Sequence, residues 1–116
     1  MNFDDAIKSH SNWKMKLSTY IRNPDKSLKA TEVGRDDVCP LGCWIHGEGR
    51  GFATLQEYTT LKAAHDRFHK AAAEIVRKAD AGETVSSDIA LSATSPYAKT
   101  SMEVVQAIMA MKRKAA

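Results

Sequence analysis

The stretch from residue 54 to residue 80 constrains the fold most, because its apolar and histidine residues recur at steps of three and four. An α-helix completes a turn about every 3.6 residues, so this spacing puts all of them on one face. The residues are Leu55, Tyr58, Leu61, His65, Phe68, His69, Ala72, Ile75, Val76 and Ala79. We therefore predict a long amphipathic helix over about 54–80, ended by Gly82, whose broad face must pack on other helices.

Another helix is predicted over residues 3–22, before the turn at Asn23-Pro24. Its apolar stripe comprises Phe3, Ile7, His10, Leu17 and Ile21, with Trp13 and Tyr20 beside it. The polar residues 23–37 that follow predict a loop, with or without a helical turn.

A short helix that carries Cys39 is predicted after this loop. Asp36 or Asp37 can cap it, and Pro40 suits its first turn. We expect it to run through Ile45, after which glycines at positions 47, 49 and 51 end it and form a flexible connector.

The last helical region is predicted from a cap at Ser86 or Ser87 to about residue 114, with a kink or break at Pro96 near Ser95. Its second half is patterned by Met102, Val105, Ile108, Met109 and Met111, for which core packing is favoured over a dimer or partner groove. The chain shows neither an internal repeat nor a strand pattern. These helices predict an all-α fold, an antiparallel four-helix bundle with an extra short helix that carries Cys39.

Length and composition indicate one globular domain over residues 1–116, with 43% hydrophobic and 27% charged residues. The net charge of +3 is modest, and the single basic cluster, Lys112-Arg113-Lys114, suits a helix end better than a nucleic acid. No apolar run approaches the roughly 20 residues that span a bilayer, and the acidic start lacks a signal-peptide pattern. We expect a cytoplasmic protein that inserts into no membrane, with its two cysteines reduced, metal-bound or redox-active.

His65 and His69 can bind one metal ion, because histidines four residues apart lie one turn apart on the same helix face. His10 lies on the apolar stripe of the first helix and Cys39 in the short helix, so a bundle would turn both inward. Three imidazoles and one thiolate are a plausible tetrahedral zinc set, and we hypothesise that these four residues bind Zn²⁺. The alternative for each is an ordinary role, as a hydrogen-bonded histidine or a small buried cysteine.

Two further candidates lie nearby in the sequence. His46, at the expected helix end, is interpreted as a surface residue or one that lies beside the ligands. Cys43 follows Cys39 by four residues and is interpreted as buried beside Trp44. It can also serve as a substitute ligand or as a second thiol in redox chemistry.

Taken together, these motifs resemble those of the chemoreceptor zinc-binding (CZB) domain family of bacteria. They are His10 in the first helix, the string Cys39-Pro40-Leu41-Gly42-Cys43-Trp44, and the string His65-Asp66-Arg67-Phe68-His69, in that order. The resemblance covers residues 3–80 by motif and the last helix by length and pattern. It implies that His10, Cys39, His65 and His69 are the zinc ligands.

The resemblance also implies a function. CZB domains are helical bundles, often homodimers, that accompany chemoreceptor or diguanylate cyclase modules in chemotaxis and related signal transduction. They sense zinc or, through the zinc-bound Cys, oxidants such as hypochlorous acid. We expect this chain to be such a sensor, with a signalling partner in cis or in trans. It differs from the family pattern by its second thiol, Cys43, and by the lack of an output domain, so we expect a stand-alone member or part of a longer protein.

Three other functions compete with this one. A metalloenzyme is disfavoured, because four protein ligands leave no open coordination position and Asp66 stands where a His-Glu-x-x-His motif has its base. A haemerythrin-like di-iron bundle would need more histidines and bridging carboxylates. The third is a metal-free helical interaction module, which the absence of zinc from purified protein would indicate.

Overall fold

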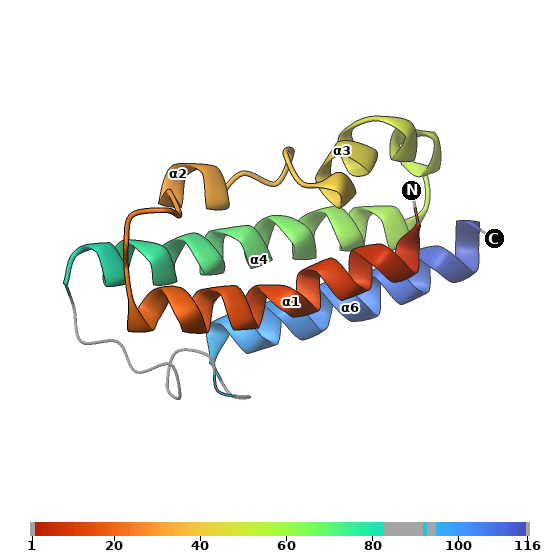
Figure 1. Ribbon diagram of the computed structural model, residues 1–116. Helices are drawn as coiled ribbons and strands as arrows, with labels where there is room; N and C mark the ends of the chain where they lie inside the picture. The colour runs from red at the N-terminus through yellow and green to blue at the C-terminus, as the bar shows by residue number, and fades with distance from the viewer. Residues whose placement is uncertain (1, 83–91, 93–94, 116) are drawn as a thin grey trace.

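A computed structural model describes residues 2–82, 92 and 95–115. Three long helices, α1 (Phe3–Arg22), α4 (Gln56–Asp80) and α6 (Pro96–Ala115), form the body of the bundle. Between α1 and α4 come the short helices α2 (Ala30–Val33) and α3 (Pro40–His46) and the 3₁₀-helix η1 (Glu48–Phe52). Figure 1 shows α2 and α3 lying along α4, which both of them contact.

The long helices do not simply alternate in direction. The Tyr20 hydroxyl near the end of α1 donates a 2.5 Å hydrogen bond to Asp80 at the end of α4, so α1 and α4 run parallel. Lys112 near the end of α6 lies 2.8 Å from Asp4 at the start of α1, so α6 runs antiparallel to both (Figure 1). The predicted all-α bundle is confirmed. Because α1 and α4 run in the same direction, the chain has to return along the bundle after α1, and α2 and α3 lie in this returning segment. The helix start predicted at Ser86 or Ser87 lies outside the described residues.

Local signals set the helix ends. Asn2 caps α1, because its side chain accepts the backbone N–H of Asp5 at 3.1 Å. At the other end of the chain, the Ser95 hydroxyl accepts the N–H of Ala98 at 3.1 Å, and Pro96 is the first residue of α6. Helix α6 therefore begins at Pro96, where the sequence predicted a kink or break, and the predicted helical residues before it lie outside the described ranges except Ser92 and Ser95.

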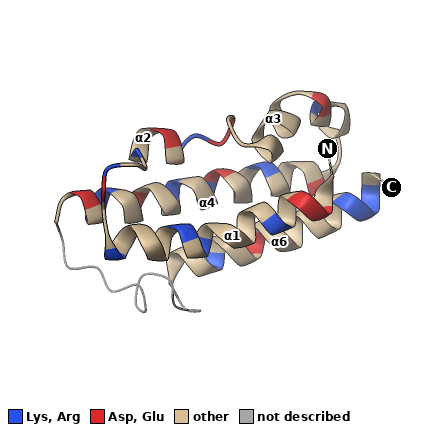
Figure 2. Ribbon diagram, viewed as in Figure 1, with Lys and Arg blue, Asp and Glu red and all other residues tan. Residues whose placement is uncertain are grey.

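Charged residues of both signs are distributed over the helices (Figure 2). The basic cluster Lys112-Arg113-Lys114 is exposed in the last turn of α6, where positive charge is favourable to the helix dipole. Within the described ranges, no helix combines the length and the apolar character that crossing a membrane requires.

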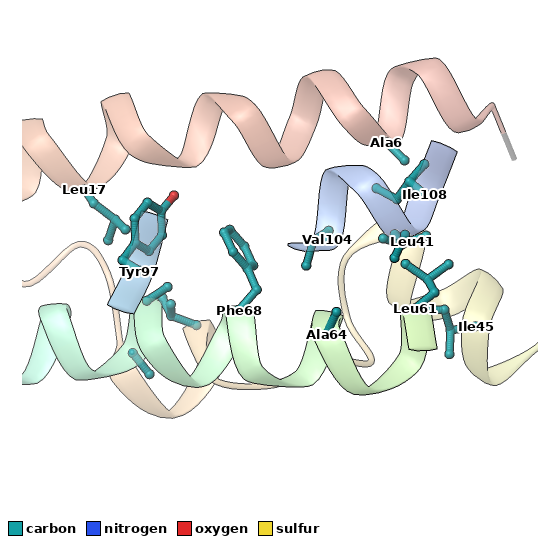
Figure 3. Packing of buried hydrophobic residues seen from close by; sticks show 14 of the residues in the cluster. Ala6, Leu17, Leu41, Ile45, Leu61, Ala64, Phe68, Tyr97, Val104 and Ile108 are labelled. Atoms are coloured by element: carbon teal, nitrogen blue, oxygen red, sulfur yellow. The ribbon is translucent and has the colours of Figure 1, made fainter. Parts of the chain in front are cut away.

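The core lies between the three long helices, where apolar side chains from α1, α4 and α6 come together (Figure 3). Leu17, Phe68, Val104 and Ile108 are completely buried there. In α4, all the residues that the periodicity placed on the inner face are buried except Leu55, which is half-buried. The interpretation of this helix is confirmed along its whole length.

The inner faces of α1 and α6 differ from the prediction. The buried residues of α1 are Ala6, His10, Leu17 and Tyr20, while Phe3, Ile7 and Ile21 pack at the edge. In α6, Met111 is buried, but Met102 and Met109 are 58% and 47% exposed, so the expected core packing of these two is wrong. Tyr97, Val104 and Ala107 share the inner face instead. A helix with apolar residues on several faces buries the face that its neighbours cover.

Candidate metal centre

His10, Cys39, His65 and His69 meet between α1, the start of α3 and α4, with their candidate ligand atoms all within 4.8 Å of one another. Cys39 Sγ lies 3.3 Å from His65 Nε2, 3.7 Å from His69 Nε2 and 4.0 Å from His10 Nε2. Zinc bonds of about 2.0–2.3 Å in a tetrahedron place ligand atoms about 3.3–3.7 Å apart. The distances from Cys39 to His65 and His69 fall in this range, whereas the two Nε2 atoms of His65 and His69 are closer, at 2.9 Å, and His10 is farther. Small side-chain shifts would fit these four donors, which have the chemistry of a zinc site, around one ion.

Backbone carbonyls orient two of the three imidazoles. The Nδ1 atoms of His10 and His69 lie 2.8 Å from the carbonyl oxygens of Ala6 and Val33. A carbonyl can only accept a hydrogen bond, so Nδ1 carries the proton and Nε2 keeps a lone pair that faces the cluster. Nothing in the sequence pattern could have identified these two carbonyls, because every residue carries one.

His65 is held differently. Its Nδ1 atom is buried and has no hydrogen-bond partner within the described part of the chain. Its ring instead packs edge-on against the rings of His69 and His10, with centroids 4.5 Å and 5.1 Å apart. Packing between imidazoles thus positions this ring, and its Nε2 atom contacts His69 Nε2 at 2.9 Å and Cys39 Sγ at 3.3 Å within the cluster.

Burial favours the neutral form of every side chain in the cluster. It lowers the pKa of His10 and His69, and it lowers that of His65 to about 2, with the neighbouring His69 and His10 adding to the effect. Neutral imidazole is the form that binds a metal ion. Burial also raises the pKa of the Cys39 thiol, so a cation must supply the positive charge that would keep it as thiolate.

Cys39 is itself the N-cap of α3, where Asp36 or Asp37 was the expected cap. Its Sγ accepts the backbone N–H of Gly42 at 3.3 Å, and Pro40 occupies the first turn as predicted. Asp37 instead pairs with Arg35 at 3.0 Å, outside the helix. The prediction of an aspartate cap is wrong, because the sulfur already fills the position from which a side chain reaches this N–H.

Gly42 lets the loop before α3 approach the helix closely enough to present Cys39. A Cβ at this position would collide with the backbone carbonyl of Asp36, which cannot move aside as a flexible side chain could. Gly42→Ala is therefore expected to destabilise the protein by about 1–3 kcal/mol, in the range of overpacked sites. Urea unfolding followed by circular dichroism measures the change.

Gly51→Ala is the matched control, because a Cβ at Gly51 meets no atom within 4 Å. This variant should keep the free energy of unfolding within about 0.5 kcal/mol of the wild-type value. Equal losses in the two variants would contradict the role assigned to the close approach at Gly42.

The two spare candidates are not among the four clustered residues. His46 is exposed, and its Nε2 atom is 3.4 Å from the Asp36 carboxylate, in agreement with its interpretation as a surface residue. Cys43 is exposed as well, and its thiol faces the Asp37 carbonyl oxygen at 3.6 Å. The interpretation of Cys43 as buried is wrong, because Cys39 is the cap with an extended backbone, so the four-residue helix repeat does not put the two thiols on one face.

The family model of the chemoreceptor zinc-binding domain matches residues 10–76, which is more than half of the chain. The chain belongs to the CZB family. The match starts at His10 and extends past His69, so all four clustered residues lie inside it. The CZB domain is a regulatory zinc-binding domain of chemoreceptor signalling, and the resemblance recognised in the sequence is confirmed. Comparison with curated proteins and with solved structures finds no match.

Proposed function

We propose that His10, Cys39, His65 and His69 together bind one Zn²⁺ ion, and that this CZB domain is a sensor whose state depends on that site. The observation that carries the proposal is the convergence of four suitable donor atoms from three separate helical elements on one buried point. Bound zinc would supply the positive charge that a thiolate and three neutral imidazoles can share. We propose one domain over residues 1–116, located in the cytoplasm.

The four residues would link helical elements that lie far apart in the sequence. His65 and His69 belong to the long helix α4, whereas Cys39 stands at the start of the seven-residue helix α3. Such a short helix has little stability of its own and depends on tertiary contacts. Ligation by Cys39 would hold the start of α3 against α4, and release would loosen it. A partner that binds these two states unequally would read the difference.

Cys39 is also the group through which an oxidant would act. Its side chain is only partly buried, so a small oxidant can approach the sulfur. Net oxygen transfer from hypochlorous acid to the thiolate forms an S–O bond and releases chloride. The resulting sulfenic acid is a poor ligand. It can then condense with the Cys43 thiol, forming the S–S bond and releasing water. We propose this reaction as the signal that empties the site.

Elemental analysis of the full chain, purified without a His tag or chelator, tests the zinc site. We expect about one zinc per chain, and stoichiometric hypochlorous acid should release it to a chromophoric indicator. Cys43→Ala should still release zinc, but a thiol reductant should restore less of the site, because sulfenic acid without a second thiol oxidises further. Protein that neither contains nor takes up zinc would overturn the site, whereas retention of zinc after Cys39 oxidation would overturn only the oxidant mechanism.

The chemistry of the cluster favours a regulatory role over catalysis. Four protein ligands would fill a tetrahedral ion and leave no position for water or substrate. Within the described ranges, the cluster contains no carboxylate, so the bridging ligands of a di-iron site are missing from it. We propose a non-enzymatic sensor that forms a homodimer and signals to a chemoreceptor or diguanylate cyclase module in cis or in trans. A metal-free helical interaction module is the function that a failed zinc test would leave.

A further inference from the structure

A pocket of about 820 Å³ lies at the end of α3 opposite to Cys39. Three elements form it: the end of α3, the 3₁₀-helix η1 and the first turns of α4. Its lining residues are His46, Gly47, Arg50, Gly51, Ala53, Tyr58 and Lys62. None of the four clustered metal-site residues belongs to this lining, so the pocket is a separate feature of the domain.

The ionisable groups of the pocket are basic, apart from the Tyr58 phenol. Arg50 and Lys62 make no ion pair and no side-chain hydrogen bond with any residue that the structure describes. Several lysines and arginines outside the pocket do pair with carboxylates, as Lys70 does with Asp66 at 2.8 Å. His46 is the one pocket cation near a carboxylate, that of Asp36 at 3.4 Å. Two permanent positive charges therefore line one hollow whose lining contains no carboxylate.

One wall of the pocket is held by a hydrogen bond, and another leaves backbone accessible. The Tyr58 hydroxyl donates a 2.6 Å hydrogen bond to the Ile45 carbonyl, which fastens the last turn of α3 to α4. A Cβ at Gly51 would meet no atom within 4 Å, so the backbone there faces open space. The N-cap residue of α4, Leu55, provides no side-chain hydrogen bond, which leaves the positive end of this helix uncapped beside the pocket. A positively charged hollow of this kind suits an anion.

We propose that this pocket binds a phosphate group, either as inorganic phosphate or as the phosphate of a small organic ester. The Arg50 guanidinium can donate two parallel hydrogen bonds to phosphate oxygens, and the Lys62 ammonium supplies a second full charge. Together they match the charge of a phosphate that is close to a dianion at neutral pH. The volume of the pocket, about 820 Å³, has room for an ester group of metabolite size beside the phosphate.

Calorimetric titration of the full chain with inorganic phosphate and with glycerol phosphate, at constant ionic strength, tests this site. We expect saturable binding with a millimolar or tighter Kd, weakened about tenfold or more by Arg50→Gln and by Lys62→Gln. Stronger binding of the ester would assign the site to an organic phosphate, and equal binding would assign it to the phosphate group alone. Circular dichroism of each variant checks that the exposed substitutions leave the fold intact.

Lys78→Gln is the matched control, since it removes one exposed positive charge from α4 outside the pocket. Its phosphate affinity should stay within about twofold of the wild-type value. A loss as large as that of Lys62→Gln would show general charge attraction and overturn the site. Absence of binding up to about 20 mM would overturn it as well. Neither result depends on zinc, because the titration can be repeated on chelator-treated protein.

Discussion

Cys39→Ala is expected to weaken zinc binding by at least about 100-fold, whereas Cys43→Ala should leave the affinity within about twofold of the wild-type value. Cys39 is the one group of the cluster that can bind as an anion, since the other three are imidazoles. Cys43 is exposed, its thiol lies 3.6 Å from the Asp37 carbonyl oxygen, and it is not among the four clustered donors. Competition with a chromophoric chelator near neutral pH measures the three affinities.

Cys39→Ser separates coordination from folding. Alanine also removes the cap on the Gly42 N–H, and loss of a cap costs about 0.5–2 kcal/mol. Serine keeps a capping oxygen, but its hydroxyl stays protonated at neutral pH and is a poor zinc ligand. Cys39→Ser should therefore fold and still bind zinc weakly. Wild-type affinity in this variant would contradict the proposed ligands, and an equal loss in Cys43→Ala would indicate that the two thiols exchange roles.

The metal-free protein is expected to lose stability steeply as the pH falls below about 6.5. Burial lowers the pKa of His10, His65 and His69 from their ordinary value of 6.5. The folded state therefore binds fewer protons than the unfolded state. The stabilisation is present above the unfolded-state pKa and is lost as the pH falls through it toward the lower folded-state pKa values.

The expected slope is large because three histidines contribute to it. Each can change the free energy of unfolding by up to about 1.4 kcal/mol per pH unit, or about 4 kcal/mol for the three. Native domains have only about 5–15 kcal/mol in total, so about one to four pH units should unfold the metal-free chain. Urea unfolding in the presence of a chelator, at several pH values between about 7.5 and 5.5, measures the slope.

Two variants identify the source of this pH dependence. His65→Met replaces one buried titrating group by an apolar side chain and should reduce the slope by about one proton. His46→Gln removes the exposed histidine and should leave the slope nearly unchanged. A free energy of unfolding that stays constant below pH 6.5 would contradict the prediction, because it would mean that the histidines titrate alike in both states.

Helix α4 is the part of the fold that the spacing of neighbouring residues predicts best. Its apolar residues recur at steps of three and four along the 25 residues of the helix, so they all lie on one face, and that face is the buried one. The shared face of His65 and His69 follows from the same geometry. Prediction was weaker for α6, where apolar residues lie on several faces. Periodicity there could not show that Met102 would be exposed and Val104 buried.

The surroundings of the candidate site needed the structure. The carbonyls of Ala6 and Val33 orient two of the imidazoles, and backbone groups leave no signature in a sequence. The sequence predicted an aspartate as the cap of α3, because Asp is a common N-cap residue and Cys is not. In the structure the N-cap is Cys39. The exposure of Cys43 followed from that same cap position.

By itself, the sequence determined the helical class of the protein, the pairing of His65 with His69 and the order of motifs that marks the CZB family. These are properties of neighbouring residues, for which helix geometry dictates the outcome. Only the tertiary structure decided that Cys39 and His10, 29 residues apart, would meet that pair, and that Arg50 and Lys62 would face one pocket. Contacts between distant segments depend on which faces pack together, and that choice is made by the buried surface of the whole bundle.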